Sequence, residues 1–310
     1  MRALASPASL KGVLSAPQAA TLLAEGFRAG GADADELPIA DGGEGTGEVL
    51  GARVVARVPV HDAFGRPREV PIRELSAETA LVEAADVIPL DPARLDALAA
   101  SSQGLGELIA HVDAERLIVC LGGTATMDGG SGLRGVLQEL PAPTTVLCDT
   151  LAPLLDAPRL FAPQKGATRE QVEPLERRLA AMEELEPYAD LPGAGAAGGL
   201  GAALASLGAE LVPGAREVLR RLDFRARVRT ADLVVTGEGT VDETTATGKA
   251  PGEALQACRE ESVRCVVFGG RVEVELADAE TVELSGDPKR AAADLLALGE
   301  RLSTRARGGR

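Results

Sequence analysis

The sequence predicts an α/β protein with two domains. Segments with strand-like and helix-like patterns alternate along most of the chain, and 36 glycines supply many tight turns. A length of 310 residues is enough for two domains, each with its own core. Apolar residues make up 45% of the chain and aromatic residues only 2%, so we expect aliphatic side chains to fill both cores.

Residues 1–52 predict the order strand, helix, strand and loop. Residues 2–6 are a short apolar run typical of a strand, and residues 17–28 carry apolar side chains at helical spacing. Residues 37–40 form a second short apolar run that leads into the glycine-rich segment ADGGEGT, residues 40–46. We therefore expect a second strand that ends in a glycine-rich loop.

Residues 53–73 interrupt this pattern. Apolar and polar residues alternate on both sides of the turn-forming segment HDAFGRP, which is typical of a β-hairpin. A hairpin within an α/β pattern indicates that a second domain is inserted into the first. We expect residues 1–52 and 230–310 to form a Rossmann-like parallel-sheet domain, and residues 53–229 to form the inserted second α/β domain.

The α/β pattern returns from residue 79 onward. Apolar runs that end in glycine or polar residues predict strands, and apolar side chains at helical spacing predict helices. The expected strands are 79–85, 116–123, 144–150, 231–239, 264–270 and 280–284, and the expected helices are 105–112, 169–185, 198–208 and 290–301.

Charge and cysteine usage exclude several classes of partner. A formal net charge of −15 repels nucleic-acid phosphates and anionic lipid, so we expect neither nucleic acid nor a membrane as a partner. The chain has no run of eighteen uncharged apolar residues and no basic-then-apolar start, and its four cysteines include no CxxC pair. These features predict a cytoplasmic protein.

The two histidines limit the chemistry that is available. Neither belongs to a histidine-carboxylate cluster, which argues against a zinc site or a histidine-based triad. The remaining reactive groups are carboxylates, lysines, hydroxyls and backbone amides. Phosphoryl transfer uses such groups, because it depends mainly on positioning and on charge stabilisation.

Three predicted strands lead into glycine-rich loops that contain acidic residues, at 40–46, 121–130 and 236–249. Ligands of parallel α/β sheets bind beyond the carboxyl ends of the strands, and glycines there allow the backbone to approach a phosphate. Glycines after strands are also ordinary turns, but three such loops favour a site. Carboxylates that could hold magnesium are Asp41, Glu44, Asp128 and Asp242, and Lys249 could neutralise phosphate oxygens.

Two motif matches fail their context test. GAGAAG at 193–198 fits a dinucleotide-binding pattern, but no strand precedes it, so a dehydrogenase is disfavoured. TGKA at 247–250 resembles a P-loop but lacks its first glycine and its Ser/Thr after the lysine.

Lysine placement gives an independent indication. The chain has 28 arginines and four lysines, and three of those lysines, Lys11, Lys165 and Lys249, lie in glycine-containing loops. A compact ammonium suits a point contact with a phosphate or a carboxylate.

Taken in order, the segments ADGGEGT, PQKGAT, PGAGAAGGLGAA and TGEG…D…GKAP resemble the bacterial glycerate kinase family. The resemblance covers nearly the whole chain. It implies two α/β domains with the site in the cleft between them. It also implies ATP- and Mg²⁺-dependent phosphorylation of D-glycerate, a small hydroxy acid, to phosphoglycerate.

The resemblance also implies roles for residues. Lys11, Asp41 and Asp242 are expected to be catalytic, and Asp41 and Asp242 to bind the metal ion. The expected contacts with substrate or ATP are Gly42, Gly43, Glu44, Gly45, Thr46, Gly122, Gly123, Thr124, Asp128, Asp149, Gln164, Lys165, Gly237, Glu238 and Lys249.

The chain departs from the family pattern at several positions, among them those occupied by Ala8, Leu105, Met127, Ala152 and Thr244. The stretch before Phe161 is also shortened, and residues 82–90 lack the family's Ser-Gly pair. Several of these departures remove polar groups from presumed site loops. Two alternatives therefore stay open: a kinase for a different small hydroxy acid, or a catalytically impaired relative that binds a nucleotide. The sequence predicts neither the oligomeric state nor the hydroxyl that is phosphorylated.

Overall fold

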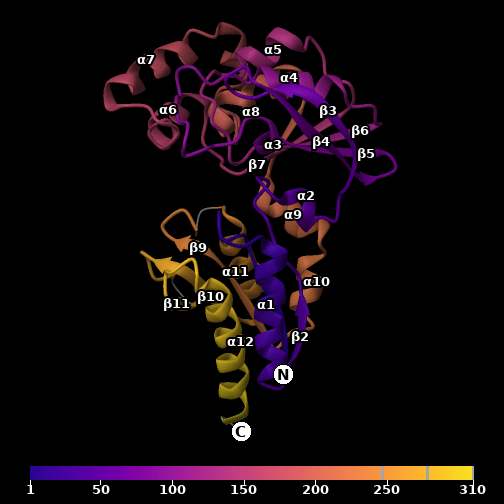
Figure 1. Ribbon diagram of the computed structural model, residues 1–310, viewed down its shortest axis with the longest axis vertical. Helices are drawn as coiled ribbons and strands as arrows, with labels where there is room; N and C mark the ends of the chain where they lie inside the picture. The colour runs from indigo at the N-terminus through magenta and orange to yellow at the C-terminus, as the bar shows by residue number, and fades with distance from the viewer. Residues whose placement is uncertain (246–247, 277–278, 309–310) are drawn as a thin grey trace. The chain divides into compact units, whose positions relative to one another are not determined.

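Two β-sheets, each with its own helices, form the computed structural model of this chain (Figure 1), which describes residues 1–245, 248–276 and 279–308. Unit 1 consists of Met1–Asp41 and Val218–Arg310, and unit 2 of Gly42–Glu217. The predicted fold class is thereby confirmed: one α/β unit contains both chain ends and the other is inserted into it. The chain passes from unit 1 to unit 2 between residues 41 and 42 and returns to unit 1 between residues 217 and 218. Both boundaries lie before the predicted ones, which were between residues 52 and 53 and between residues 229 and 230.

Unit 1 contains a five-stranded sheet in which every neighbouring pair of strands is parallel. Its order is β11-β10-β9-β1-β2, so the first strand of the chain lies beside a strand from its last third. The strands are β1 (Arg2–Pro7), β2 (Asp33–Glu36), β9 (Leu233–Val241), β10 (Arg264–Val272) and β11 (Glu280–Glu283).

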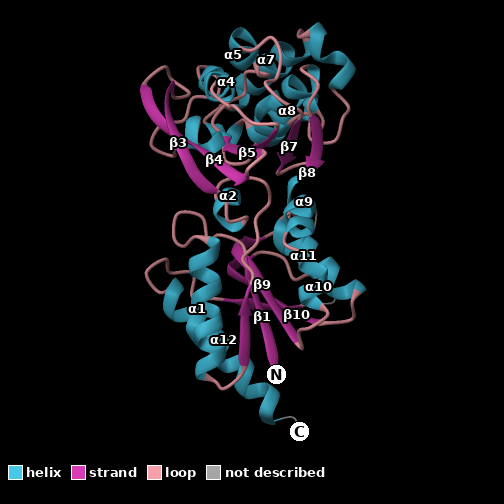
Figure 2. Ribbon diagram, turned by 90° about the vertical axis from the view of Figure 1, so that its right-hand side faces the viewer, coloured by secondary structure: helices cyan, strands magenta, loops and turns pink. Residues whose placement is uncertain are grey.

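Helices cover both faces of this sheet. Figure 2 shows α1 and α12 on one face and α10 and α11 on the other. Glycines let α1 and α12 approach closely, because a Cβ at Gly26 would lie 2.1 Å from the carbonyl oxygen of Leu296. The helices are α1 (Ala16–Ala29), α10 (Phe224–Val228), α11 (Ala250–Glu260) and α12 (Ala291–Gly308), and α9 (Gly214–Arg221) spans the boundary between the units.

Unit 2 contains a six-stranded mixed sheet in the order β3-β4-β5-β6-β7-β8. The predicted hairpin is confirmed, because β3 and β4 pair antiparallel from Arg53↔Glu74 to His61↔Pro67. From β5 to β8 the pairs are parallel. The strands are β3 (Arg53–His61), β4 (Pro67–Ser76), β5 (Thr79–Glu83), β6 (Arg116–Cys120), β7 (Thr144–Cys148) and β8 (Glu210–Pro213).

Helices and 3-10 turns complete unit 2. The helix expected at 169–185 ends earlier, and a separate 3-10 turn follows it. The helices are α2 (Thr46–Val49), α3 (Ala84–Val87), α4 (Gln103–Ala110), α5 (Ser131–Val136), α6 (Ala157–Phe161), α7 (Arg169–Ala180) and α8 (Ala196–Ser206), and the 3-10 turns are η1 (Leu154–Asp156), η2 (Pro163–Lys165) and η3 (Glu183–Tyr188).

Two strand predictions in unit 1 are wrong in their limits. Residues 37–40 are not a strand, because β2 ends at Glu36. The amides of Leu37 and Ile39 still donate to the carbonyls of Ala5 and Pro7 in β1. The strand expected at 231–239 begins at Leu233 and continues to Val241, because its pairing with β10 reaches Val241↔Val272.

Both cores are aliphatic, as the composition predicts. The core of unit 2 includes Val82, Leu105, Leu108 and Val119, and that of unit 1 includes Leu23, Val235 and Leu295 with two phenylalanines. Among the described residues, none of the helices combines the length and the apolar character needed to cross a membrane.

Candidate active site

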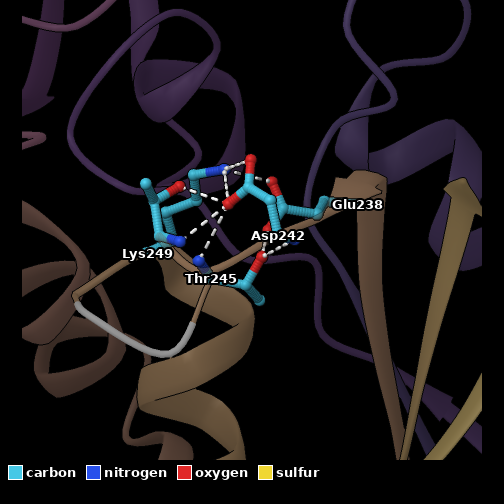
Figure 3. Close-up of polar contacts among 5 residues, drawn as sticks. Glu238, Asp242, Thr245 and Lys249 are labelled. Carbon is cyan, nitrogen blue, oxygen red and sulfur yellow. Dashed lines mark hydrogen bonds and ion pairs between the residues drawn. The ribbon is translucent and has the colours of Figure 1, made fainter. Parts of the chain in front are cut away.

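Strand β9 carries Glu238 between two glycines. A Cβ at Gly237 would lie 2.2 Å from the carbonyl oxygen of Phe268 in β10, so this position requires glycine. Glu238 points its carboxylate toward the loop that follows the strand (Figure 3), and its side chain is 15% exposed. Burial raises the pKa of this carboxyl, while the nearby Lys249 opposes that rise.

The loop after β9 is built around Asp242. The amides of Thr244 and Thr245 donate to Asp242 Oδ1 at 2.8 and 3.2 Å, which is the geometry of an Asx turn. Thr245 Oγ1 donates to Glu238 Oε1 at 2.8 Å and accepts from the amide of Asp242 at 3.0 Å. Thr245 therefore ties the loop to the strand. Two residues of the predicted 236–249 segment, 246 and 247, lie outside the described residues.

Lys249 joins the two carboxylates (Figure 3). Its Nζ lies 3.4 Å from Glu238 Oε2, and 3.3 and 3.4 Å from Asp242 Oδ1 and Oδ2. The residue is the N-cap of α11, and its carbonyl accepts the amide of Glu253, so its backbone is fixed by the helix. The side chain remains 28% exposed. The ammonium is thus held by two acids and is still accessible.

These groups border a pocket of about 700 Å³ in unit 1. Its walls are segments that follow or end the parallel strands, which is the usual ligand position in an open α/β sheet. Four of the predicted site residues line this pocket: Lys11, Asp41, Glu238 and Lys249. Asp242 contacts one of them, Lys249. Gly237 lies next to Glu238 in β9. The structure therefore brings together the predicted site residues of unit 1.

A second group of predicted residues gathers in unit 2, after β6 and β7. A Cβ at Gly122 would lie 2.7 Å from Gly43 Cα and 3.1 Å from Asp149 Oδ2. A Cβ at Gly123 would lie 3.8 Å from Glu44 Cβ. Three segments that are distant in sequence, at 43–44, at 122–123 and at Asp149 directly after β7, are therefore close together.

Glu83 supports the 42–46 segment, and sequence reasoning missed it. Its carboxylate, 3% exposed, accepts the amides of Gly45 at 3.0 Å and Gly47 at 2.6 Å. Thr46, between these glycines, is buried at the start of α2. Gly42 has φ +90° and packs against Leu147. Glu83 thus fixes the backbone of the ADGGEGT segment.

Asp128 is buried and has a structural set of partners. Its Oδ2 accepts Ser102 N, Ser102 Oγ and Gly132 N at 2.8–3.1 Å, and its Oδ1 accepts Gly130 N at 3.1 Å. Because these donors belong to the loop and to neighbouring helix starts, the carboxylate holds the 121–130 loop in shape. Thr124, in the same loop, is also buried.

Lys165 is a buried cation. Its Nζ donates to the carbonyl oxygen of Thr126 at 2.8 Å, and the residue is 4% exposed. Burial lowers its pKa to about 8, although Asp149 and Asp128 act in the opposite direction. Gln164, its neighbour in η2, is exposed. Lys165 therefore contacts the 121–130 loop, while Gln164 is exposed to solvent.

Several residues of the pocket in unit 1 were missed. Gly239 and Thr240 lie in β9, Gly270 and Arg271 in β10, and residues 283–288 follow or end β11. One signal was present: residues 264–270 are an apolar strand that ends in two glycines, the same pattern that selected the other loops. Residues after β11 carry no such pattern.

The glycerate kinase family profile matches residues 3–142 and 135–286 of this chain. Glycerate kinase of Bacillus subtilis (strain 168) is 33% identical, over 88% of this chain and 85% of its own length. Glycerate 2-kinase of Escherichia coli K12 is 34% identical, over 81% and 80%. A crystal structure from Salmonella typhimurium LT2, provisionally described as glycerate kinase 2, superimposes with a TM-score of 0.79 at 30% identity, covering 100% of this chain and 99% of that one. The chain therefore belongs to the glycerate kinase family.

Proposed function

We propose that this chain catalyses the ATP- and Mg²⁺-dependent phosphorylation of D-glycerate to phosphoglycerate, in the cytoplasm. Family membership supports the reaction class. The observation that carries the proposal is Lys249, held between Glu238 and Asp242 at the border of a pocket at the carboxyl ends of a parallel sheet. An accessible ammonium and carboxylates at such an edge are what a triphosphate and its metal ion require.

The residues of unit 1 fit a magnesium ion that is shared with phosphate. Among the described residues, no group of three or more acidic, histidine or cysteine side chains is arranged to hold a metal. Mg²⁺ usually needs only one or two carboxylates together with substrate phosphates and water. Asp242 and Asp41 would supply such carboxylates. When bound, the ion would neutralise charge on the transferred phosphoryl group.

In the proposed reaction, a hydroxyl oxygen of glycerate attacks the γ-phosphorus of ATP. The bond from that phosphorus to the oxygen of the β-phosphate breaks and ADP leaves. The hydroxyl passes its proton to a carboxylate, for which Asp41 and Asp242 are the candidates. Lys249 would move its contact from the carboxylates to phosphate oxygens, and Lys11 would contact phosphate or substrate.

Four of the departures from the family pattern are explained locally by packing or by hydrogen bonds. Leu105 and Met127 are fully buried in the cores of unit 2, so they act on packing. Thr244 keeps a polar role, because its hydroxyl donates to Asp242 Oδ1. Ala8 donates its amide to the carbonyl of Gly237, an interaction that any residue but proline could make.

The test is turnover of the purified protein with D-glycerate, ATP and Mg²⁺. ADP should be released only when all three are present, and phosphorus NMR of the product should show which hydroxyl carries the phosphate. A panel of other small hydroxy acids distinguishes a different substrate. ADP release no higher than in a blank with every acid would overturn the proposal.

A further inference from the structure

The pocket of unit 1 extends beyond the residues that take part in the proposed reaction. Its lining runs from Asp41, which follows β2, to Pro288, which follows β11. β2 and β11 are the two edges of the five-stranded sheet. Four steps between neighbouring strands, each of about 4.8 Å, make this span on the order of 19 Å. Glu238 and Lys249 contact only its middle, over β9, so the β11 end requires its own explanation.

The β11 end has apolar walls. Leu284, Pro288 and Ala291 line it, and Ala291 is buried in the core of unit 1 at the start of α12. Gly270 adds bare backbone at the end of β10, where a Cβ would lie 2.8 Å from the carbonyl oxygen of Gly239. Such walls suit a flat, uncharged ring system better than a phosphate.

Charge differs between the two ends of the pocket. The lysines that line it, Lys11 and Lys249, follow β1 and the β9 loop. The β11 end presents the carboxylates of Glu283, Asp287 and Asp294 instead, and of these Asp294 lies 3.7 Å from the guanidinium of Arg290. Arg271 also lines the pocket, but its side chain is 73% exposed and lies 4.0 Å from Glu273. A phosphate is therefore favoured at the lysine end and repelled at the β11 end.

Asp294 is held in place within this end. Its Oδ2 accepts the amide of Ser285 at 3.1 Å and also the Ser285 hydroxyl. The carboxylate comes from α12, and Ser285 lies in the turn after β11, so the bond fixes the turn against the helix. A fixed carboxylate at a pocket wall can accept hydrogen bonds from hydroxyl groups of a ligand.

We propose that the β11 end of the pocket binds the nucleoside of ATP, an assignment that rests on the proposed function. The base packs against Leu284, Pro288 and Ala291, and the carboxylates of this end accept bonds from ribose hydroxyls. The phosphate chain then runs across β10 and β9 to Lys249. The volume of about 700 Å³ is of the size that small-molecule sites have.

The test compares ADP with tripolyphosphate, which carries charge but no nucleoside. Pro288→Trp places a large side chain on an exposed lining position. Lys289→Trp, one residue further and outside the lining, is the matched control. We expect Pro288→Trp to weaken ADP binding at least tenfold by calorimetry and to change tripolyphosphate binding less than twofold. Lys289→Trp should change both less than twofold.

A second measurement needs no variant. Irradiation of the wild-type protein with 8-azido-ADP should label the tryptic peptide 272–289, which contains β11 and the turn after it. Labelling confined to other peptides, an ADP affinity unchanged in Pro288→Trp, or an equal loss of tripolyphosphate binding would each overturn the assignment. If these results agree with the assignment but no acid is phosphorylated, the proposed reaction fails while the nucleoside site stands.

Discussion

Acidic side chains that lie in the glycine-rich segments or bond to them have different partners in the two units. In unit 2, Asp128 and Glu83 are buried and accept hydrogen bonds from backbone amides and from Ser102. In unit 1, Glu238 and Asp242 share the ammonium of Lys249 beside a pocket. Asp128 and Glu83 stabilise the conformation of loops, whereas Glu238 and Asp242 place charged groups beside a pocket.

The difference lies in which partners can be exchanged. A backbone amide cannot leave its carboxylate without a change in the fold of the loop. The contacts of Lys249 are 3.3–3.4 Å long, whereas tight charge-assisted bonds measure about 2.7–2.9 Å. A phosphate or a divalent ion can therefore displace this ammonium. We infer that an acid in a glycine-rich segment is a candidate for catalysis when its partner is a mobile side chain.

Asp242→Asn gives the largest expected effect. It removes the negative charge that Lys249 and a metal ion need, and the amide can still accept from Thr244. We expect turnover of D-glycerate to fall about 10²–10³-fold, with thermal unfolding close to that of the wild type. Glu243→Gln, at the exposed neighbouring position, is the matched control and should retain turnover. A wild-type rate in Asp242→Asn would remove this residue from the proposed mechanism.

Asp128→Asn makes the same change of side chain in unit 2, and here we expect an effect on stability. The new amide group would face a backbone N–H of the loop, so a buried donor loses its acceptor. We expect the free energy of unfolding to fall by about 2–3 kcal/mol, while turnover per folded molecule changes less than threefold. Urea denaturation and an assay on the same sample measure both quantities. A large loss of turnover with unchanged stability would mean that Asp128 belongs to the chemistry.

The sequence predicted the fold class and most elements because apolar periodicity and turn residues are local signals. It also singled out Lys11, Asp41, Glu238 and Lys249, half of the charged residues that line the pocket of unit 1, because they lie in glycine-containing segments. It missed Glu83 and Thr245, because their roles depend on contacts with other segments. It treated Asp128 and Asp242 alike, since both are acids in glycine-rich segments, and only burial and partners separate them.

Lys165 extends the comparison to cations. Its pKa is lowered to about 8 in the folded protein, below the value of about 10.5 expected for an unfolded chain. Between these values the unfolded state binds more protons, so stability rises with pH. Below about pH 8 the cost of burying the charge is present in full. We expect the stability of the wild type to gain on the order of 2 kcal/mol between pH 7 and pH 10 from this group.

Lys165→Met is the reference for that measurement. The difference in unfolding free energy between wild type and variant should change with pH, because tyrosine and cysteine titrate in both proteins and cancel. Two stability curves that stay parallel from pH 7 to pH 10 would show that the ammonium is not desolvated as its burial implies.

Glu83→Gln gives the smallest expected effect. The variant loses one acceptor for the amides of Gly45 and Gly47, but it also removes the cost of burying a charge, so the two terms oppose each other. We expect the free energy of unfolding to change by about 1 kcal/mol or less at pH 7.

The pH dependence of stability is more informative, because burial raises the pKa of the Glu83 carboxyl above its ordinary value. A raised pKa stabilises the folded state at low pH, and that contribution is lost as the pH rises through the folded value. The stability of the wild type relative to Glu83→Gln should therefore fall between pH 4 and pH 7, measured by urea denaturation in both proteins. If it rises instead, the hydrogen bonds from the two amides and the charge of the nearby Arg73 outweigh the desolvation of this carboxylate.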